Sequence, residues 1–278
     1  MPPSRRSGIP TEVDCPAPAA TLRQITLSPN KRMGDPVFEA GLDGVTFISA
    51  GCKLLGGFYR GAGDTPRPTA VLVHGLPGIE KHLDIAYRLR DLGWNCLYFH
   101  FRGCWGSAGA YSLAGLIDDT REAVDWVARQ PSVDRERIAL VAGSTGAHPA
   151  VMLGAVDERV RTIVGISPVI VPGAFEFPRT MADEFAGMLL GVTGDELLNQ
   201  WQALEPLSEP MRAFAPREIL VIAAGRDTIF PASQYAASIA ALPNVTFVQE
   251  DDSDHGFSAS RPWLVRAVTD WLVAKLDA

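Results

Sequence analysis

Short runs of consecutive apolar residues recur along most of the chain, and longer amphipathic segments separate them. The apolar runs are 70–75, 95–101, 138–143, 160–167, 218–225 and 245–250. Continuous valine, isoleucine and leucine without alternation is typical of strands covered on both faces, as in a parallel sheet. The segments between these runs predict helices at 81–92, 112–129, 145–155, 232–241 and 262–276. The alternation therefore predicts an α/β fold with a mostly parallel, doubly wound sheet.

The predicted helix 112–129 shows how its two faces should differ. Four apolar residues share one face at helical spacing: Ile117, Ala123, Val124 and Val127. The charged residues of the same segment are expected to be largely exposed to solvent: Asp118, Asp119, Arg121, Glu122 and Asp125. This helix should cover one face of the sheet.

The pattern differs before residue 62. Segments 21–27 and 44–61 are rich in β-forming residues, broken by glycines, and they alternate in a way that predicts antiparallel strands and hairpins at an exposed edge. Residues 1–20 contain five prolines, so we expect an N-terminal extension without packed structure.

Residues 168–215 separate two predicted strands by more than a crossover requires. Thr193 and Glu196 form a capping-box pattern that predicts a helix start. Large apolar residues are too frequent for a plain loop: Phe175, Phe177, Phe185, Met188, Leu189, Trp201 and Met211. We therefore expect one core formed by 21–167 and 216–278, with 168–215 inserted as a small helical lid.

Composition and charge narrow the classes of partner. The chain has 25 Lys and Arg against 32 Asp and Glu, a net charge of −7, without a basic run, which argues against nucleic acid and anionic membrane. The four cysteines are scattered, without metal-ligand spacing, and are expected to be reduced thiols. The N-terminus lacks the apolar region of a signal peptide, and no run of about 18 apolar residues predicts a membrane span. We expect a cytoplasmic protein that uses no metal or cofactor, with oligomeric state left open.

Candidate chemistry lies just after the predicted strands, where open α/β sheets place their sites. Ser144 follows the run 138–143 within Ala142-Gly143-Ser144-Thr145-Gly146, and small neighbours suit a nucleophile on a tight strand-to-helix turn. A serine at such a turn is also a common helix N-cap, and by itself the motif does not decide between these interpretations.

Two further polar residues, Asp227 and His255, also follow predicted strands and join Ser144 as candidates for catalysis. Asp227 and His255 follow the last two apolar runs, so Ser144, Asp227 and His255 occur in this order on successive loops. This order favours catalysis by a nucleophile, a base and an acid that orients the base. Asp252 and Asp254 are alternatives for the acid. Because they flank His255 in the sequence, their carboxylates are expected to point less readily at Nδ1 of its ring. Cys104 does not lie on a predicted tight strand-to-helix turn, so we do not expect it to be the nucleophile.

These motifs resemble those of the α/β-hydrolase superfamily over residues 44–278. The sequence "HGLPG" (74–78) matches a loop that in this superfamily supplies one donor of the oxyanion hole, which implies the backbone N–H groups of Leu76 and Thr145 as donors. The segment "RGCWGSAGAY" (102–111) resembles cinnamoyl-esterase-like and acyl-peptidase-like members at Arg102, Gly103, Gly106 and Ser107. The resemblance implies an α/β-hydrolase fold with antiparallel N-terminal strands.

The departures from the superfamily pattern are Ala142, Trp105 and the pair His148-Pro149. His148 either lines the pocket or packs in the core, and packing is favoured. The residues expected near a pocket are His74, Trp105, His148, Phe175, Phe185, Met188 and Trp201.

The sequence thus predicts a serine hydrolase that cleaves a carboxylic ester, or a related acyl substrate with an apolar or aromatic part, through an acyl-enzyme. An acyl-peptidase, a thioesterase and a C–C bond hydrolase would use the same residues. A ligand-binding protein without catalysis is the alternative outside enzymes.

Overall fold

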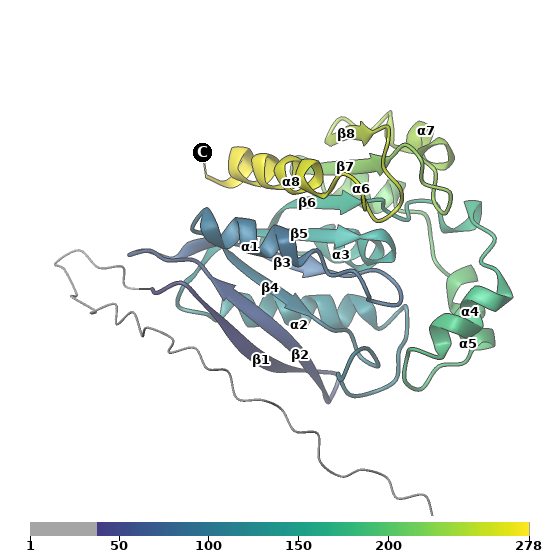
Figure 1. The fold of residues 1–278 in the computed structure, drawn as a ribbon, viewed down its shortest axis with the longest axis horizontal. Coiled ribbons are helices and arrows are strands. Elements are labelled where there is room, and N and C mark those ends of the chain that lie inside the picture. Colours follow the sequence, from purple (N-terminus) through teal and green to yellow (C-terminus); the bar gives the residue numbers. More distant parts are fainter. Residues whose placement is uncertain (1–37, 278) are drawn as a thin grey trace, which may run out of the picture. The chain divides into compact units, whose positions relative to one another are not determined.

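An eight-stranded sheet forms the centre of residues 38–277, the part of the chain that the computed structural model describes (Figure 1). The strands are β1 (Gly41–Ser49), β2 (Cys52–Arg60), β3 (Arg67–Val73), β4 (Asn95–Phe99), β5 (Val133–Gly143), β6 (Val160–Ile166), β7 (Glu218–Ala224) and β8 (Val245–Glu250). Their order is β1-β2-β4-β3-β5-β6-β7-β8, with β1 and β2 antiparallel and the strands from β4 to β8 parallel. The predicted fold class is confirmed.

Helices cover both faces of the sheet. The helices α1 (Leu83–Asp91) and α8 (Arg261–Leu276) pack on one face, and α2 (Leu116–Ala128) and α3 (Ala147–Gly154) on the other (Figure 1). In β3, Val71 and Val73 join the core beneath α2 and α3, whereas Ala70 and Leu72 join the core beneath α1 and α8. Successive residues of a strand point to opposite faces, so both must be apolar here.

Two predicted helices differ from the observed ones. The segment 232–241 contains a short 3-10 turn (Ala232–Gln234) and α7 (Ala236–Ile239), because Tyr235 between them has φ −134°, outside the helical region. The helix predicted at 145–155 begins with a 3-10 turn, Ser144–Gly146, before α3. The predictions for 1–20 and 21–27 lie outside the described residues.

The inserted segment contains α4 (Arg179–Ala186), α5 (Gly194–Gln202) and α6 (Ser208–Ala213). Figure 1 shows α4 and α5 beyond the ends to which β5 and β6 point. The predicted capping box starts α5: Glu196 N–H donates to Thr193 Oγ1, and Thr193 N–H donates to the Glu196 carboxylate. Phe177 and Trp201 belong to the same apolar core as α2 and α3, so this segment packs as part of the main core.

Asp119 corrects the sequence analysis, because it is fully buried rather than exposed. It lies in the first turn of α2 and faces the loop after β4. Its carboxylate accepts a hydrogen bond from the Arg102 N–H at 2.9 Å, and Arg102 Nε lies 2.7 Å from it. Burial raises the pKa of Asp119, whereas the contacts with Arg102 oppose that rise. Arg102, which the sequence motif singled out, therefore stabilises the conformation of the loop after β4 through its contacts with Asp119.

We expect Asp119→Ala to lower the free energy of unfolding by about 3–5 kcal/mol, because it leaves the Arg102 guanidinium largely buried without its partner. Asp118→Ala is the matched control, since Asp118 is exposed and pairs only with Arg121 one turn away. That change should cost about 0.5 kcal/mol or less. Chemical denaturation of both variants measures the difference, and equal losses would contradict the structural role of Asp119.

Candidate active site

Ser144 lies at the sharp turn between β5 and α3. Its backbone φ is +51°, a left-handed conformation that non-glycine residues rarely adopt. Close packing surrounds the turn: a Cβ on Gly146 would lie 2.4 Å from the carbonyl oxygen of Val73, and one on Gly75 would lie 2.9 Å from Ser144 Cβ. The N-cap of α3 is Gly146, so the structure does not support Ser144 as the cap of that helix. Strain of this kind is typical of functional positions.

Asp227 and His255 form a hydrogen-bonded pair on the loops after β7 and β8. The His255 Nδ1 atom lies 2.7 Å from Asp227 Oδ2. The other oxygen, Oδ1, accepts hydrogen bonds from the N–H groups of Ile229 and Phe230, both at 2.9 Å. Burial acts to raise the pKa of Asp227, but the hydrogen bond and charge of His255 and the two N–H groups lower it overall. The carboxylate is therefore ionised and fixed in orientation.

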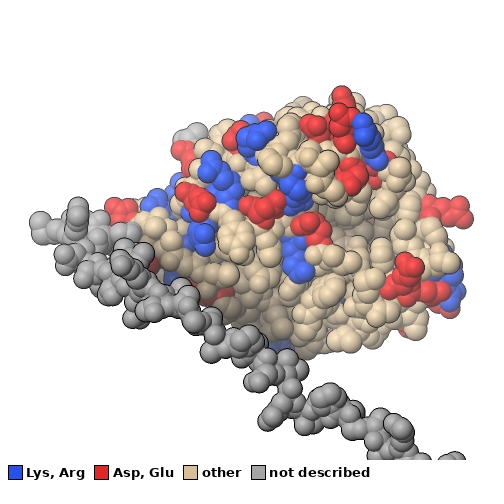
Figure 2. All heavy atoms as spheres, in the orientation of Figure 1, with Lys and Arg blue, Asp and Glu red and all other residues tan. Residues whose placement is uncertain are grey.

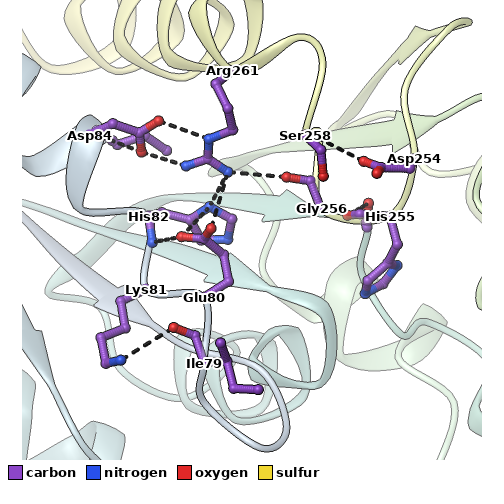
Figure 3. Close-up of polar contacts among 12 residues, drawn as sticks. Ile79, Glu80, Lys81, His82, Asp84, Asp254, His255, Gly256, Ser258 and Arg261 are labelled. Carbon is purple, nitrogen blue, oxygen red and sulfur yellow. Dashed lines mark hydrogen bonds and ion pairs between the residues drawn. The ribbon is translucent and has the colours of Figure 1, made fainter.

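The two alternative acids have other partners. Asp252 pairs with Arg226, and Asp254 accepts a hydrogen bond from the Ser258 N–H at 2.8 Å (Figure 3). Neither contacts the imidazole of His255 through a hydrogen bond. Of the three acids considered from the sequence, Asp227 is the one that contacts the ring.

Ser144 and His255 line the same two cavities, which differ in their other lining residues. The larger cavity, of about 190 Å³, is bounded by the loop 75–80, by His82 and by Gly256. The smaller cavity, of about 90 Å³, is bounded by the inserted segment. Within residues 38–277, Ser144 Oγ forms no hydrogen bond with His255, and this contact is often long in hydrolases without substrate.

The backbone N–H groups of Leu76 and Thr145 adjoin the smaller cavity, which both residues line together with Ser144. Leu76 N–H donates to no backbone carbonyl of the described residues. Thr145 lies in the first turn of the helical segment after β5, where N–H groups have no partner within a helix. That these two N–H groups form an oxyanion hole beside Ser144 stays a prediction.

Aromatic side chains dominate the smaller cavity. Phe175, Phe185 and Trp201, expected from the sequence, line it. The sequence analysis did not place the other lining residues near a pocket: Phe177, Met181, Ile229 and Phe230. Phe230 follows Asp227 by three residues, and its ring lies 5.7 Å from that of His255, so its position next to the acid was the signal that could have found it.

His74 and His148, also expected near a pocket, line neither cavity and are both buried. His74 Nδ1 lies 2.7 Å from the Gly75 carbonyl oxygen, and its Nε2 accepts a hydrogen bond from the Phe101 N–H at 3.3 Å. Burial lowers the pKa of His74 to about 3 and also lowers that of His148. His74 therefore joins the loop after β3 to the loop after β4, and His148 packs within α3, as favoured.

Trp105 and Met188 are the remaining two expected pocket residues, and they also line neither cavity. Trp105 is 44% exposed and donates from Nε1 to the Pro77 carbonyl oxygen at 2.9 Å, so it supports the loop 75–80 from outside. Met188 is 45% exposed. Exposure of these side chains depends on loop conformations that the sequence pattern does not specify.

The sequence analysis missed His82 and Glu80, which line the larger cavity. No motif marked them, because their position depends on contacts with Arg261 far along the chain.

Two buried neutral histidines predict acid sensitivity. Burial lowers the pKa of His74 to about 3 and that of His82 to about 4, against about 6.5 in an unfolded chain. Their contribution to stability is complete above pH 6.5 and is lost as the pH falls, because the unfolded state then binds protons that the folded state does not. We expect these two groups to lower the free energy of unfolding by about 4 kcal/mol between pH 7 and pH 5, and His100, whose pKa burial lowers to about 4, to add to this fall. Denaturation at both values tests this, and a flat profile would contradict it.

The described residues were predicted to bind no metal ion, membrane or nucleic acid, and four structural features bear on these predictions. Within the described part of the chain, no cluster of three or more His, Cys, Asp or Glu residues could hold a metal ion. No helix from residue 38 to residue 277 is long and apolar enough to cross a bilayer. On the face shown in Figure 2, acidic and basic side chains are interspersed. Cys52, Cys96 and Cys104 are unpaired among the described residues, as expected, and Cys15 lies outside them.

The amino-acid sequence is similar to those of known proteins. It is 31% identical over 209 residues to the uncharacterized protein Rv2307c of Mycobacterium tuberculosis, covering 74% of this chain and 68% of that protein. It is 29% identical over 168 residues to the uncharacterized protein YfhR of Salmonella typhimurium, covering 57% of each. No protein-family model matches the sequence.

Solved structures share its fold. The 2,6-dihydroxy-pseudo-oxynicotine hydrolase matches with a TM-score of 0.71 and 16% identity, over 85% of this chain and 68% of that one. Est1E from Butyrivibrio proteoclasticus matches with a TM-score of 0.68 and 14% identity, over 84% and 99%. A parallel sheet with helices on both faces and a strained serine after β5 defines the class of hydrolase folds. The chain has the α/β-hydrolase fold.

Proposed function

We propose that the protein is a serine hydrolase that cleaves a carboxylic ester, or a related acyl substrate, through an acyl-enzyme. The observation that carries this proposal is the pair of cavities that Ser144 shares with a histidine already hydrogen-bonded to a buried carboxylate. Among the described residues, the hydroxyl of Ser144 forms no hydrogen bond. A serine with a free hydroxyl is the residue type that a histidine–carboxylate pair activates.

The proposed mechanism assigns a step to each of these residues. Ser144 Oγ attacks the acyl carbon, and its proton passes to Nε2 of His255. Asp227 accepts the Nδ1 proton in a hydrogen bond, which holds the reactive tautomer and stabilises the imidazolium. The N–H groups of Leu76 and Thr145 receive the developing oxyanion, and a donor of this kind is worth about 3 kcal/mol in a serine protease. The proton on Nε2 of His255 then passes to the alcohol oxygen as the ester C–O bond breaks, which releases the alcohol and leaves the acyl group on Ser144 Oγ. His255 next takes a proton from a water molecule that attacks the acyl carbon, and this proton returns to Ser144 Oγ as the acid is released.

The smaller cavity supports a substrate with an apolar or aromatic part. Its lining of phenylalanine and tryptophan rings offers apolar contacts beside Ser144. We propose that residues 168–215 act as the lid over this cavity. Thioesters, acyl-peptides and some C–C bonds would meet the same residues, so the bond cleaved is the finer part of the proposal.

A fluorophosphonate probe tests the proposal. The wild-type protein should form one covalent adduct at Ser144, identified by mass spectrometry of the peptide, and Ser144→Ala should form none. Turnover of p-nitrophenyl esters, acyl-CoA and aminoacyl anilides then separates esterase, thioesterase and peptidase activities. A folded wild-type protein that stays unlabelled and hydrolyses none of these would favour the ligand-binding alternative.

A further inference from the structure

His82 is a buried residue at the wall of the larger cavity. It is 6% exposed, it lines that cavity with Ser144 and His255, and it precedes α1 in a left-handed conformation with φ +55°. Its Nε2 atom lies against the residue before the proposed nucleophile, since a Cβ on Gly143 would lie 2.6 Å from it. A polar ring atom is thus held beside the substrate space.

Arg261 fixes the tautomer of His82. Arg261 Nη1 lies 3.2 Å from His82 Nδ1, and a guanidinium can only donate, so Nδ1 must accept. Glu80 Oε1 is 3.7 Å from Nδ1, too far to take a proton from it in a hydrogen bond. Arg261 is itself held by two hydrogen bonds to Asp84 and donates to the Gly256 carbonyl oxygen (Figure 3). When the ring is neutral, its proton is therefore on Nε2.

The surroundings of His82 keep the ring neutral. Burial, foremost, together with the charges of Arg261 and His255, lowers the pKa of His82 to about 4, although Glu80 and Asp84 act in the opposite direction. Among the described residues, no protein acceptor receives the Nε2–H of His82 in a hydrogen bond. Because this N–H has no protein acceptor and His82 lines the cavity, it is available to a ligand oxygen that can accept from it.

We propose that His82 determines specificity by donating a hydrogen bond from Nε2–H to an oxygen of the substrate in the larger cavity. This inference rests on the proposed function and names its substrate class. That class is an acyl compound with an apolar or aromatic part in the smaller cavity and a carbonyl, carboxylate or hydroxyl oxygen on the opposite side of the scissile bond. Arg261, held by Asp84, positions the donor, and neither of these two residues lines the cavity.

Two matched ester pairs test the proposal, because each pair exchanges one ketone oxygen for a methylene of nearly the same shape. The first pair is the acetonyl and 2-methylallyl esters of 3-phenylpropanoic acid, with the change on the alcohol side. The second pair is the benzyl esters of 4-oxopentanoic and 4-methylpent-4-enoic acids, with the change on the acyl side. The measurement is the ratio of kcat/KM values, ketone over alkene, for wild type, His82→Phe and His82→Gln.

We expect the wild type to prefer the ketone by about 10- to 100-fold in at least one pair, the effect of one hydrogen bond to a buried donor. His82→Phe should bring that ratio to within about threefold of unity. His82→Gln should retain most of the preference, because its amide can donate from a similar position.

The outcomes separate this inference from the proposed function. A wild-type protein that is labelled at Ser144 and hydrolyses these esters without any ketone preference overturns the inference alone, whatever the variants do. A preference that survives in folded His82→Phe also overturns it, because another donor would then be responsible. Loss of the preference in both variants would assign the effect to ring shape and overturn the donor role. A protein that is neither labelled nor active overturns both proposals.

Discussion

Replacing Ser144 with alanine or glycine is expected to lower kcat by about 10⁶-fold, to the level left by binding and the oxyanion donors. The loss is large because the hydroxyl that is removed is the proposed nucleophile. Initial rates with the best ester of the panel measure the loss. Residual turnover above about 1% of wild type would show that another group performs the attack.

The same two variants should differ in stability. Ser144 has φ +51°, which costs a residue with a Cβ about 1 kcal/mol and costs glycine almost nothing. We therefore expect Ser144→Gly to unfold with a free energy about 1 kcal/mol higher than Ser144→Ala, while both are inactive. Thermal or chemical denaturation of the pair provides the measurement. Equal stabilities would indicate that the turn relaxes when the hydroxyl is removed, and that its strain depends on the serine.

The sheet could be predicted from the sequence because its information is local. A strand such as β3 is covered by helices on both faces, so every position must be apolar and the run is visible without knowing any partner. The order of Ser144, Asp227 and His255 has the same origin, since each follows the end of such a run. Parallel strands bring their carboxyl ends to one edge, which brings these loops together.

The features that the sequence could not predict depend on contacts between residues that lie far apart in the chain. Asp119 has the pattern of a solvent-facing helical acid, but Arg102 from another loop makes its burial tolerable. His82 faces the cavity with a defined tautomer only because Arg261, 179 residues later, lies against its Nδ1. His74 was expected near a pocket, yet hydrogen bonds to two backbone groups hold it within the core.

Asp227→Asn is expected to lower kcat by about 10⁴-fold with little change in KM, because the substrate-binding surfaces are unchanged. The structure specifies why. Two backbone N–H groups, of Ile229 and Phe230, donate to Oδ1, so the asparagine amide must keep its oxygen there and turn its NH₂ toward His255. That NH₂ donates to Nδ1, which places the ring proton on Nε2 and leaves no atom to receive the proton of Ser144.

Asp254→Asn is the matched control for that variant, because Asp254 is the direct neighbour of His255 in sequence. Its Oδ1 accepts a hydrogen bond from the Ser258 N–H, and an asparagine oxygen can accept the same bond. Its side chain is exposed and makes no hydrogen bond to the imidazole, so kcat should stay within about twofold of wild type. Comparable losses in the two variants would mean that negative charge near the loop, and not the bond to Nδ1, supports the reaction. A loss confined to Asp227→Asn would assign the effect to the tautomer that Asp227 selects.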